Sequence, residues 1–185
     1  MLVKNPYRIS SNVLEWQQIR WDQMAIGLIA LSVSAYAEVK LPFGLVPFTF
    51  QTLVIMLIGL KLNPREALIT VASYIFLGAI GAPIWSGGSF GLAHLAGPTG
   101  GFLFGFFFAA LTISFLVKTL DWNHWGLKLL ALVLGQAFLF AMGVSWLSLF
   151  VGWETAIASG LLPFLPSAFI KTAIALALVP TLHTK

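Results

Sequence analysis

Six apolar runs, separated by short polar or glycine-rich connections, constrain the fold of this chain more than any other feature. A helix needs about 20 residues to cross the hydrocarbon core of a bilayer, and only helices or closed barrels satisfy their backbone polar groups there. The runs cover residues 24–37, 48–62, 67–82, 101–120, 126–152 and an interrupted stretch between 155 and 182. They predict an all-α fold: an integral membrane six-helix bundle that forms a single membrane domain over residues 1–185.

The composition excludes a water-soluble domain. Only 9% of the residues are charged and 59% are apolar, whereas soluble domains carry about 25% charged residues. The chain has no cysteine, which excludes disulfides and thiolate metal sites. The net charge of +4 does not indicate nucleic-acid binding, because the basic residues are scattered along the chain.

The first apolar run is interpreted as a span and not as a cleaved signal. Ala35-Tyr36-Ala37 has the small-x-small pattern of a cleavage site. However, the charged segment before the run is longer than twenty residues, and five further apolar runs follow it.

The distribution of lysine and arginine predicts the orientation, since cytoplasmic loops carry an excess of both. With the amino terminus inside, only Lys40 and Lys171 fall toward the outer side. We therefore predict a multi-pass protein of the cell membrane, lying in the lipid bilayer with both termini cytoplasmic. The eight inner basic residues are Lys4, Arg8, Arg20, Lys61, Arg65, Lys118, Lys128 and Lys185.

The predicted outer connection, residues 83–101, contains six glycines and no formal charge. It is too glycine-rich for a stable span, yet Trp85 and Phe90 make it too apolar for an ordinary exposed loop. Irregular backbone at such a depth is tolerated where it lies on protein or lines a cavity. A lid over an outward-facing pocket fits this composition. The alternative is an interfacial loop that only fills the mouth of the bundle.

Lys171 is an ionisable residue inside the last apolar run. Pro163 and Pro166 interrupt that run, so we expect a helix to restart near Ser167 with Lys171 one turn inside it, in the outer half of the membrane. A charge within a membrane is costly and is a functional-site hypothesis by default. An ammonium near a helix amino terminus forms an anion site. The alternative is a lysine that snorkels to the outer headgroups.

A third polar feature lies at the start of the second run, where Thr49, Gln51 and Thr52 follow Pro47. We expect Gln51 and Thr52 in the first turn of that helix, where they either cap the helix and bond to neighbours or face a ligand. His94 stands alone in the sequence, so we expect no metal site and no cofactor. There is no Walker motif, so any ATP must be bound by another chain.

Small residues are spaced for close helix packing at two places. Ala30 and Ser34 are four positions apart in the first run, and Gly101 and Gly105 have the same spacing in the fourth. Such pairs allow two helix backbones to approach closely.

Several motifs, in order along the chain, resemble the BioY family, the biotin-specific S components of energy-coupling-factor (ECF) transporters. The matching region runs from about residue 30 to residue 171. The most specific pieces are Val46-Pro47-Phe48-Thr49-x-Gln51-Thr52, Leu77-Gly78-Ala79-Ile80-Gly81-x-Pro83, Gly87-Gly88, Gly91-Leu92 and Gly97-Pro98-Thr99-Gly100-Gly101.

The resemblance implies a protein that captures biotin outside the cell with high affinity, in a pocket under the outer 83–101 loop. It also implies a partner, a membrane coupling subunit that carries two cytoplasmic ATPases. Ala30 and Ser34 match the family positions that pack against this subunit, and Lys171 matches a lysine of the last helix. The family commonly has an aspartate three residues before that lysine, where this chain has Ala168.

Biotin suits the side chains at these motifs. Its ureido ring needs directed donors and acceptors, its thiophane ring needs apolar walls, and its carboxylate needs a cation. The predicted substrate-binding residues are Lys171, Gln51, Thr49, Trp85, Ser86, Ser89, Phe90, Thr99 and Ser167.

The sequence is also compatible with other functions. An S component for another small vitamin-like carboxylate is the nearest alternative, because the acidic partner of Lys171 is missing. An intramembrane enzyme would need titratable groups that converge at one depth, and the carboxylates and histidines here are dispersed. A pore would need a polar stripe along a span, and none is visible. We therefore expect a transport protein and not an enzyme.

Overall fold

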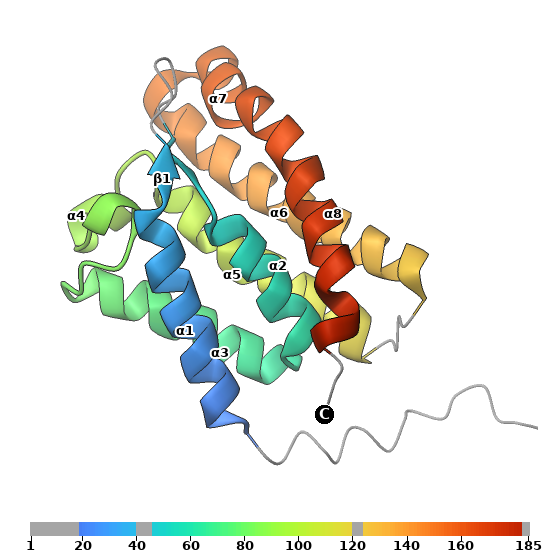
Figure 1. The fold of residues 1–185 in the computed structure, drawn as a ribbon. Coiled ribbons are helices and arrows are strands. Elements are labelled where there is room, and N and C mark those ends of the chain that lie inside the picture. The colour runs from blue at the N-terminus through green and yellow to red at the C-terminus, as the bar shows by residue number, and fades with distance from the viewer. Residues whose placement is uncertain (1–18, 40–45, 120–123, 183–185) are drawn as a thin grey trace, which may run out of the picture.

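The computed structural model describes residues 19–39, 46–119 and 124–182, which are mainly helical (Figure 1). Two-residue strands β1 (Glu38–Val39) and β2 (Phe48–Thr49) pair antiparallel. Short turns of other helix types are η3 (Ser86–Gly88), the π-helical η4 (Phe115–Thr119) and η5 (Leu162–Phe164). The α-helices are α1 (Trp21–Tyr36), α2 (Gln51–Lys61), α3 (Pro64–Ala79), α4 (Leu92–Leu95), α5 (Gly100–Ser114), α6 (Trp125–Val151), α7 (Trp153–Gly160) and α8 (Leu165–Leu182).

The helices follow the predicted apolar runs, but they differ in length. Among the described residues, three segments are long and apolar enough to cross a membrane: Gly100–Lys118, Trp125–Val151 and Trp153–Leu178. By contrast, α1 and α3 have 16 residues each and α2 has 11. The predicted mainly helical fold, with helices that are able to cross a membrane, is therefore confirmed. Six complete spans remain a prediction.

The last run divides differently from the prediction. The helix α8 begins at Leu165 and not near Ser167, so Lys171 lies nearly two turns inside it. Pro166 is tolerated in this first turn, because the backbone N–H groups of a first turn make no hydrogen bond within the helix and proline lacks only that group.

Glycines let α5 and α6 pack closely in antiparallel directions. A Cβ on Gly101 would lie 2.1 Å from the Cβ of Trp146, and one on Gly105 would lie 2.8 Å from the carbonyl oxygen of Leu139. The close approach predicted from the Gly101–Gly105 spacing is thus confirmed. The two helices carry most of one wall of the pocket described below.

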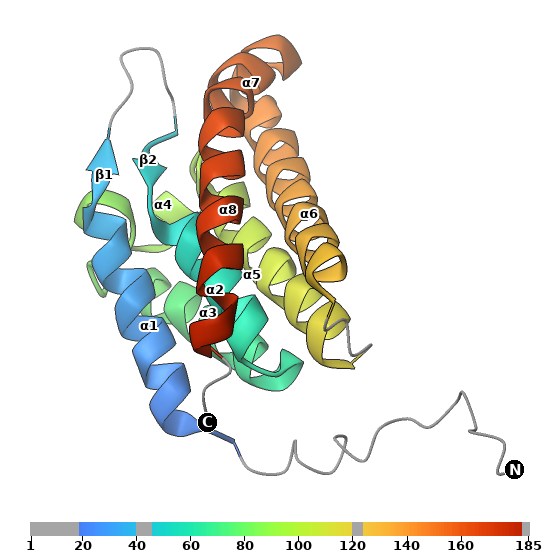
Figure 2. The same ribbon diagram turned by 45° about the vertical axis from the view of Figure 1, so that its right-hand side comes forward.

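Polar contacts join α1 to the turn between α2 and α3 at one end of the bundle. Asn63 and Glu66 form a reciprocal capping box at the start of α3. Arg20 pairs with the Glu66 carboxylate at 2.7 Å and also donates to the carbonyl oxygen of Lys61 at 3.4 Å. The start of α1 and the end of α8 lie at this same end, the lower one in Figure 2. The short strands lie at the opposite end.

Candidate functional site

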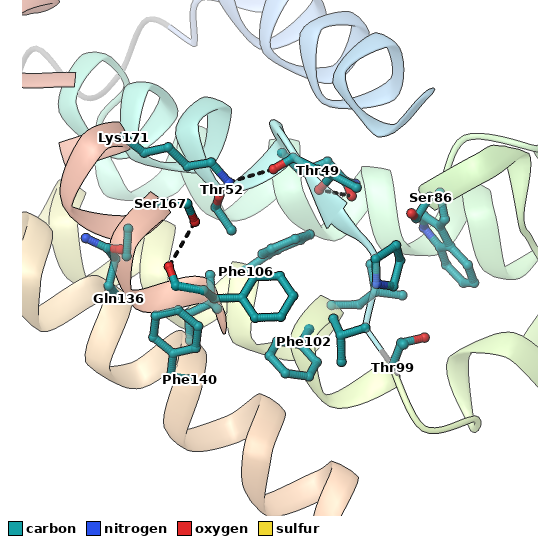
Figure 3. Close-up of a pocket in the computed structure, with 18 of the residues that line it drawn as sticks. Thr49, Thr52, Ser86, Thr99, Phe102, Phe106, Gln136, Phe140, Ser167 and Lys171 are labelled. Atoms are coloured by element: carbon teal, nitrogen blue, oxygen red, sulfur yellow. Dashed lines mark hydrogen bonds between the residues drawn. The ribbon is translucent and has the colours of Figure 1, made fainter. Parts of the chain in front are cut away.

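A pocket lies between the start of α2, the connection from α3 to α5, and helices α5, α6 and α8 (Figure 3). In Figure 3, Lys171 and Thr52 lie at one end, Ser86 and Thr99 lie at the other, and phenylalanine rings lie between them. The lining residues are Val46, Pro47, Thr49, Gln51, Thr52, Trp85, Ser86, His94, Thr99, Phe102, Leu103, Phe106, Gln136, Leu139, Phe140, Phe164, Ser167, Ala168 and Lys171.

Lys171 places a cation inside the protein. Its side chain comes from α8 and is only 5% exposed. The ammonium donates to the carbonyl oxygen of Thr49 at 2.6 Å and to the hydroxyl of Thr52 at 2.7 Å. It also lies 4.5 Å from the ring centroid of Phe48, within cation–π range. The ammonium therefore points into the bundle, which does not fit the snorkelling alternative.

The charge of Lys171 has neutral partners. An ammonium has three donor hydrogens, and two of them are used by Thr49 and Thr52. Ala168, one turn earlier on α8, lines the pocket beside it. Within residues 19–39, 46–119 and 124–182, no carboxylate forms an ion pair with Lys171. A third donor and an uncompensated charge are thus available to an anionic ligand.

Gln51 is held by a series of side-chain hydrogen bonds at the start of α2. As predicted, it stands in the first turn of that helix. Its side-chain oxygen accepts from Thr49 at 3.0 Å, and its nitrogen donates to the hydroxyl of Tyr74. Tyr74 in turn donates to the carbonyl oxygen of Ile84 at 2.8 Å. The amide of Gln51 therefore bonds to neighbours without capping α2, and it joins α2, α3 and the connection.

Trp85 packs the connection onto α3. Its side chain is 1% exposed, and a Cβ on Gly78 would lie 2.1 Å from its Cε2 atom. Gly78 thus leaves the space that the indole occupies against the helix. Because Trp85 also lines the pocket, the contact with Gly78 sets the shape of that wall.

His94 links the two ends of the same connection. Its Nε2 atom lies 3.2 Å from the hydroxyl of Ser89 and 3.3 Å from the hydroxyl of Thr99. Its ring lies over the indole of Trp85, with centroids 5.6 Å apart. Burial lowers the pKa of His94 below its ordinary value of 6.5, so the neutral ring is favoured.

The connection is also tied to the end of α1. The hydroxyl of Ser86 donates to the Glu38 carboxylate at 2.5 Å, and the hydroxyl of Tyr36 donates to the carbonyl oxygen of Pro83. Gly87 has a φ of 61° and Gly91 has a φ of 90°, conformations that favour glycine. The glycines therefore allow the turns that bring Ser86 back toward β1.

Two of the predicted substrate residues do not line this pocket. Phe90 is 55% exposed and lies outside the lining. The hydroxyl of Ser89 bonds to Ser86 and His94, so it supports the lining without forming part of it. Both residues follow Gly88, whose φ of 77° is a conformation that favours glycine. The other predicted residues do line it: Lys171, Gln51, Thr49, Trp85, Ser86, Thr99 and Ser167.

The pocket also has an aromatic wall and a glutamine, Gln136, that were not predicted from the sequence. Phe102 and Phe106 are one turn apart on α5 and face the pocket, together with Phe140 from α6. Their spacing resembles that of any apolar helix, so no sequence signal distinguished them. Gln136 did carry a signal, because a polar residue within a membrane span is usually functional. Its amide donates to the hydroxyl of Thr172 at 2.6 Å.

Ala30 and Ser34 lie away from the pocket. Both are half-buried on α1, and the hydroxyl of Ser34 bonds back to the carbonyl oxygen of Leu31 at 2.9 Å. Ala30 lines a shallow groove between α1 and α2.

Comparisons with known proteins place the chain in one family. The model of the BioY family matches residues 11–185. A probable biotin transporter BioY from Pyrococcus horikoshii is 32% identical over 161 residues, which cover 85% of this chain and 95% of that protein. Biotin transporter BioY2 from Lactococcus lactis subsp. cremoris is 34% identical over 166 residues, which cover 86% of this chain and 91% of the relative.

Solved structures share the fold. The crystal structure of an S component for biotin from an ECF-type ABC transporter superposes with a TM-score of 0.82 and 26% sequence identity, over 95% of both chains. FolT bound with folic acid superposes with a TM-score of 0.61 and 21% identity, over 89% of this chain and 91% of FolT, which shows a common fold alone. The family match over almost the whole chain and the two relatives above 30% identity show that this chain belongs to the BioY family.

Proposed function

We propose that this chain is the biotin-binding S component of an ECF-type transporter and captures biotin in the pocket around Lys171. The observation that carries the proposal is a buried ammonium without a carboxylate partner among the described residues, at one end of a pocket with apolar walls. The names of the relatives, which are biotin transporters, support the same substrate.

The groups along the pocket follow the order of the matching groups along biotin. Lys171 supplies the cation for the carboxylate, and the rings of Phe102 and Phe106 supply apolar contact for the valeryl chain and the thiophane ring. Ser86 and Thr99, at the other end, supply hydroxyl groups for the ureido ring. Burying most of a ligand against apolar walls while a few polar groups orient it is typical of small-molecule sites.

We propose a topology of six spans with both termini cytoplasmic and the pocket near the outer face of the cell membrane. The excess of lysine and arginine on one side of the chain supports this orientation. The connection that carries Trp85 and His94 then forms an outer lid, because both residues line the pocket from that side.

The proposed partner is a membrane coupling subunit with two cytoplasmic ATPases, docked on α1. Ala30 and Ser34 are small and one turn apart, and Ala30 lines the groove toward α2. A helix of the partner can approach such a face closely. Exposed apolar side chains beside it, Ile26, Ile29 and Val33, extend the contact surface.

A second candidate substrate is another small vitamin-like carboxylate. The observation that favours it is Ala168, which stands beside Lys171 where the family commonly has an acidic residue. Without that residue, the pocket selects for a carboxylate more strongly than for a particular ring. An intramembrane enzyme has less support, because the relatives are transporters.

Equilibrium binding of radiolabelled biotin to the purified chain separates these substrates. The proposal predicts saturable binding that unlabelled biotin abolishes and that lipoate, a vitamin-like carboxylate of similar length, displaces only weakly. Displacement by lipoate at equal or lower concentration would favour the second candidate. Absence of saturable biotin binding would contradict the proposal and leave the second candidate standing.

A further inference from the structure

Building on the proposed function, we infer that two hydroxyl groups recognise the ureido ring of biotin in fixed and opposite roles. Ser86 accepts a hydrogen bond from an N–H group of the ring, and Thr99 donates one to its carbonyl oxygen. Both residues lie at the end of the pocket opposite Lys171 (Figure 3). Glu38 lies outside the pocket lining. It is a positioning residue that acts on the ligand through Ser86.

The carboxylate of Glu38 determines the direction of its hydrogen bond with Ser86. An ionised carboxylate can only accept, whereas a hydroxyl has one proton and two lone pairs. The hydroxyl of Ser86 lies 2.5 Å from Oε2 of Glu38 and therefore donates its proton to that atom. Because this proton is used, the Ser86 oxygen can bind a ligand only as an acceptor.

The backbone holds Glu38 against Ser86. Glu38 lies in β1, where it pairs with Thr49 of β2. Gly87 has a φ of 61°, and a Cβ on it would lie 2.7 Å from Oε1 of Glu38. The turn after Ser86 therefore fits closely around the carboxylate, and a side chain at position 87 would displace it.

A second series of hydrogen bonds leaves the proton of Thr99 available. The hydroxyl of Ser89 donates to the carbonyl oxygen of Ser86 at 2.8 Å, so it can only accept from His94. The Nε2 atom of His94, 3.2 Å from that hydroxyl, therefore carries a hydrogen. The same atom lies 3.3 Å from the hydroxyl of Thr99, so Thr99 cannot donate to it. In the part of the chain that the structure describes, the Thr99 hydroxyl donates to no other group.

A cyclic urea matches this pair of hydroxyl groups. Its ring carries N–H donors on both sides of one carbonyl acceptor, so an acceptor and a donor at one end of the pocket satisfy it. A site built to hydrogen-bond a ligand group rejects analogues that lack the group, because its own polar atoms are then left unpaired. Lipoate has neither group on its dithiolane ring and would leave Ser86 and Thr99 without partners.

Biotin analogues that differ only in the ureido ring test the two roles by equilibrium binding to the purified full-length chain. The N-methylbiotins each lack one N–H donor, and thiobiotin carries sulfur, a weak acceptor, in place of the ureido oxygen. We expect Ser86→Ala to weaken biotin binding by about tenfold and to have little effect on one of the N-methylbiotins. Thr99→Val should weaken biotin binding by about tenfold and have little effect on thiobiotin.

The role of Glu38 is tested by a double-mutant cycle with Ser86. Glu38→Met should weaken biotin binding by about fivefold and have no further effect in a chain that already carries Ser86→Ala. Glu38→Gln keeps an oxygen that accepts from Ser86 and should retain most of the affinity, which separates loss of the acceptor from a failure to fold. Glu154→Met is the matched control, because Glu154 is exposed on α7 and outside the pocket lining.

Two results would overturn these roles while biotin capture itself stands. One is a loss of biotin affinity in Glu38→Met that is as large with Ser86→Ala as without it. The other is an equal loss of biotin and thiobiotin affinity in Thr99→Val. A wild-type chain without saturable biotin binding would instead overturn the proposed function, and the roles of Ser86 and Thr99 with it.

Discussion

The ammonium of Lys171 lies 2.7 Å from the hydroxyl of Thr52, so α8 and α2 meet at one buried cation across 119 residues of sequence. The same ammonium bonds to the backbone of Thr49 at the end of β2. These contacts orient the lysine and leave one donor for a ligand. Because the lysine side chain is already ordered by its neighbours, ligand binding costs little further side-chain entropy.

Gly78→Ala should weaken biotin binding by displacing Trp85. The added methyl group would lie 2.1 Å from the Cε2 atom of the indole, so the indole must move and the pocket wall with it. Overpacking of this kind costs about 1–3 kcal/mol, and a drop in melting temperature measured in detergent should accompany the lost affinity. Gly126→Ala is the control, because nothing lies within 4 Å of its Cβ position. Unchanged binding in Gly78→Ala would show that the position of Trp85 does not matter.

His94 should make the thermal stability of the ligand-free protein depend on pH. The pKa of His94 is lowered in the folded protein because the ring is buried, so the unfolded chain takes up a proton first on acidification. The contribution of the neutral ring is complete above the ordinary pKa of 6.5 and is lost as the pH falls through the lower folded value. Melting curves from pH 7.5 to 5 should therefore fall more steeply for the wild type than for His94→Gln. Parallel curves would contradict this role.

Ala30→Leu and Ser34→Leu should weaken capture of the coupling subunit while biotin binding to the isolated chain stays intact. A bulky side chain holds two helices apart at a face where small residues allow backbone contact, at a cost of about 1–3 kcal/mol. Co-purification with the tagged coupling subunit measures the effect. If the double variant still forms the complex, this face of α1 is not the docking surface.

Cysteine labelling can test the orientation directly, because the natural chain has no cysteine. Single cysteines at Ser89 and Glu154 should react with a membrane-impermeant maleimide in intact cells. Cysteines at Arg65 and Asp121 should react only after the membrane is opened. The reverse pattern would overturn both the proposed topology and the proposed direction of transport.

Much of the fold could be predicted because its physical cause is local in sequence. The helices follow apolar runs that a bilayer requires, and the interruption before α8 follows from the missing N–H of Pro163. The lengths of α1, α2 and α3 could not be predicted in the same way. Their ends depend on tertiary contacts, such as the pairing of Arg20 with Glu66, which joins residues 46 positions apart.

Site residues could be predicted where a polar side chain stands within an apolar run of the sequence. Lys171 and Gln51 are polar residues in apolar runs, and both line the pocket. Phe102 and Phe106 were not anomalous, since phenylalanine on a membrane helix faces lipid as readily as a ligand. Phe90 as a substrate residue stays a prediction: it is 55% exposed and does not line this pocket, and the positive φ angles of Gly88 and Gly91 beside it could not be read from the sequence.

Lys171 is proposed to bind the carboxylate of biotin. Removing the charge of the lysine, or the charge of the ligand, tests this contact. Charge-assisted hydrogen bonds contribute about 1.5–3 kcal/mol, so Lys171→Met should weaken biotin binding by about ten- to a hundredfold. Biotinol has no carboxylate and should bind the wild type more weakly than biotin does. Ala168→Asp should reduce the preference for biotin by giving the lysine an internal partner.

The decisive measurement is equilibrium titration of biotin and biotinol against the wild type and Lys171→Met. We predict that the wild type prefers biotin and that Lys171→Met binds both ligands with similar, weak affinity. Equal losses for biotin and biotinol would mean that Lys171 contacts the ureido ring instead. Unchanged affinity for both ligands in Lys171→Met would contradict the assignment of this pocket as the biotin site.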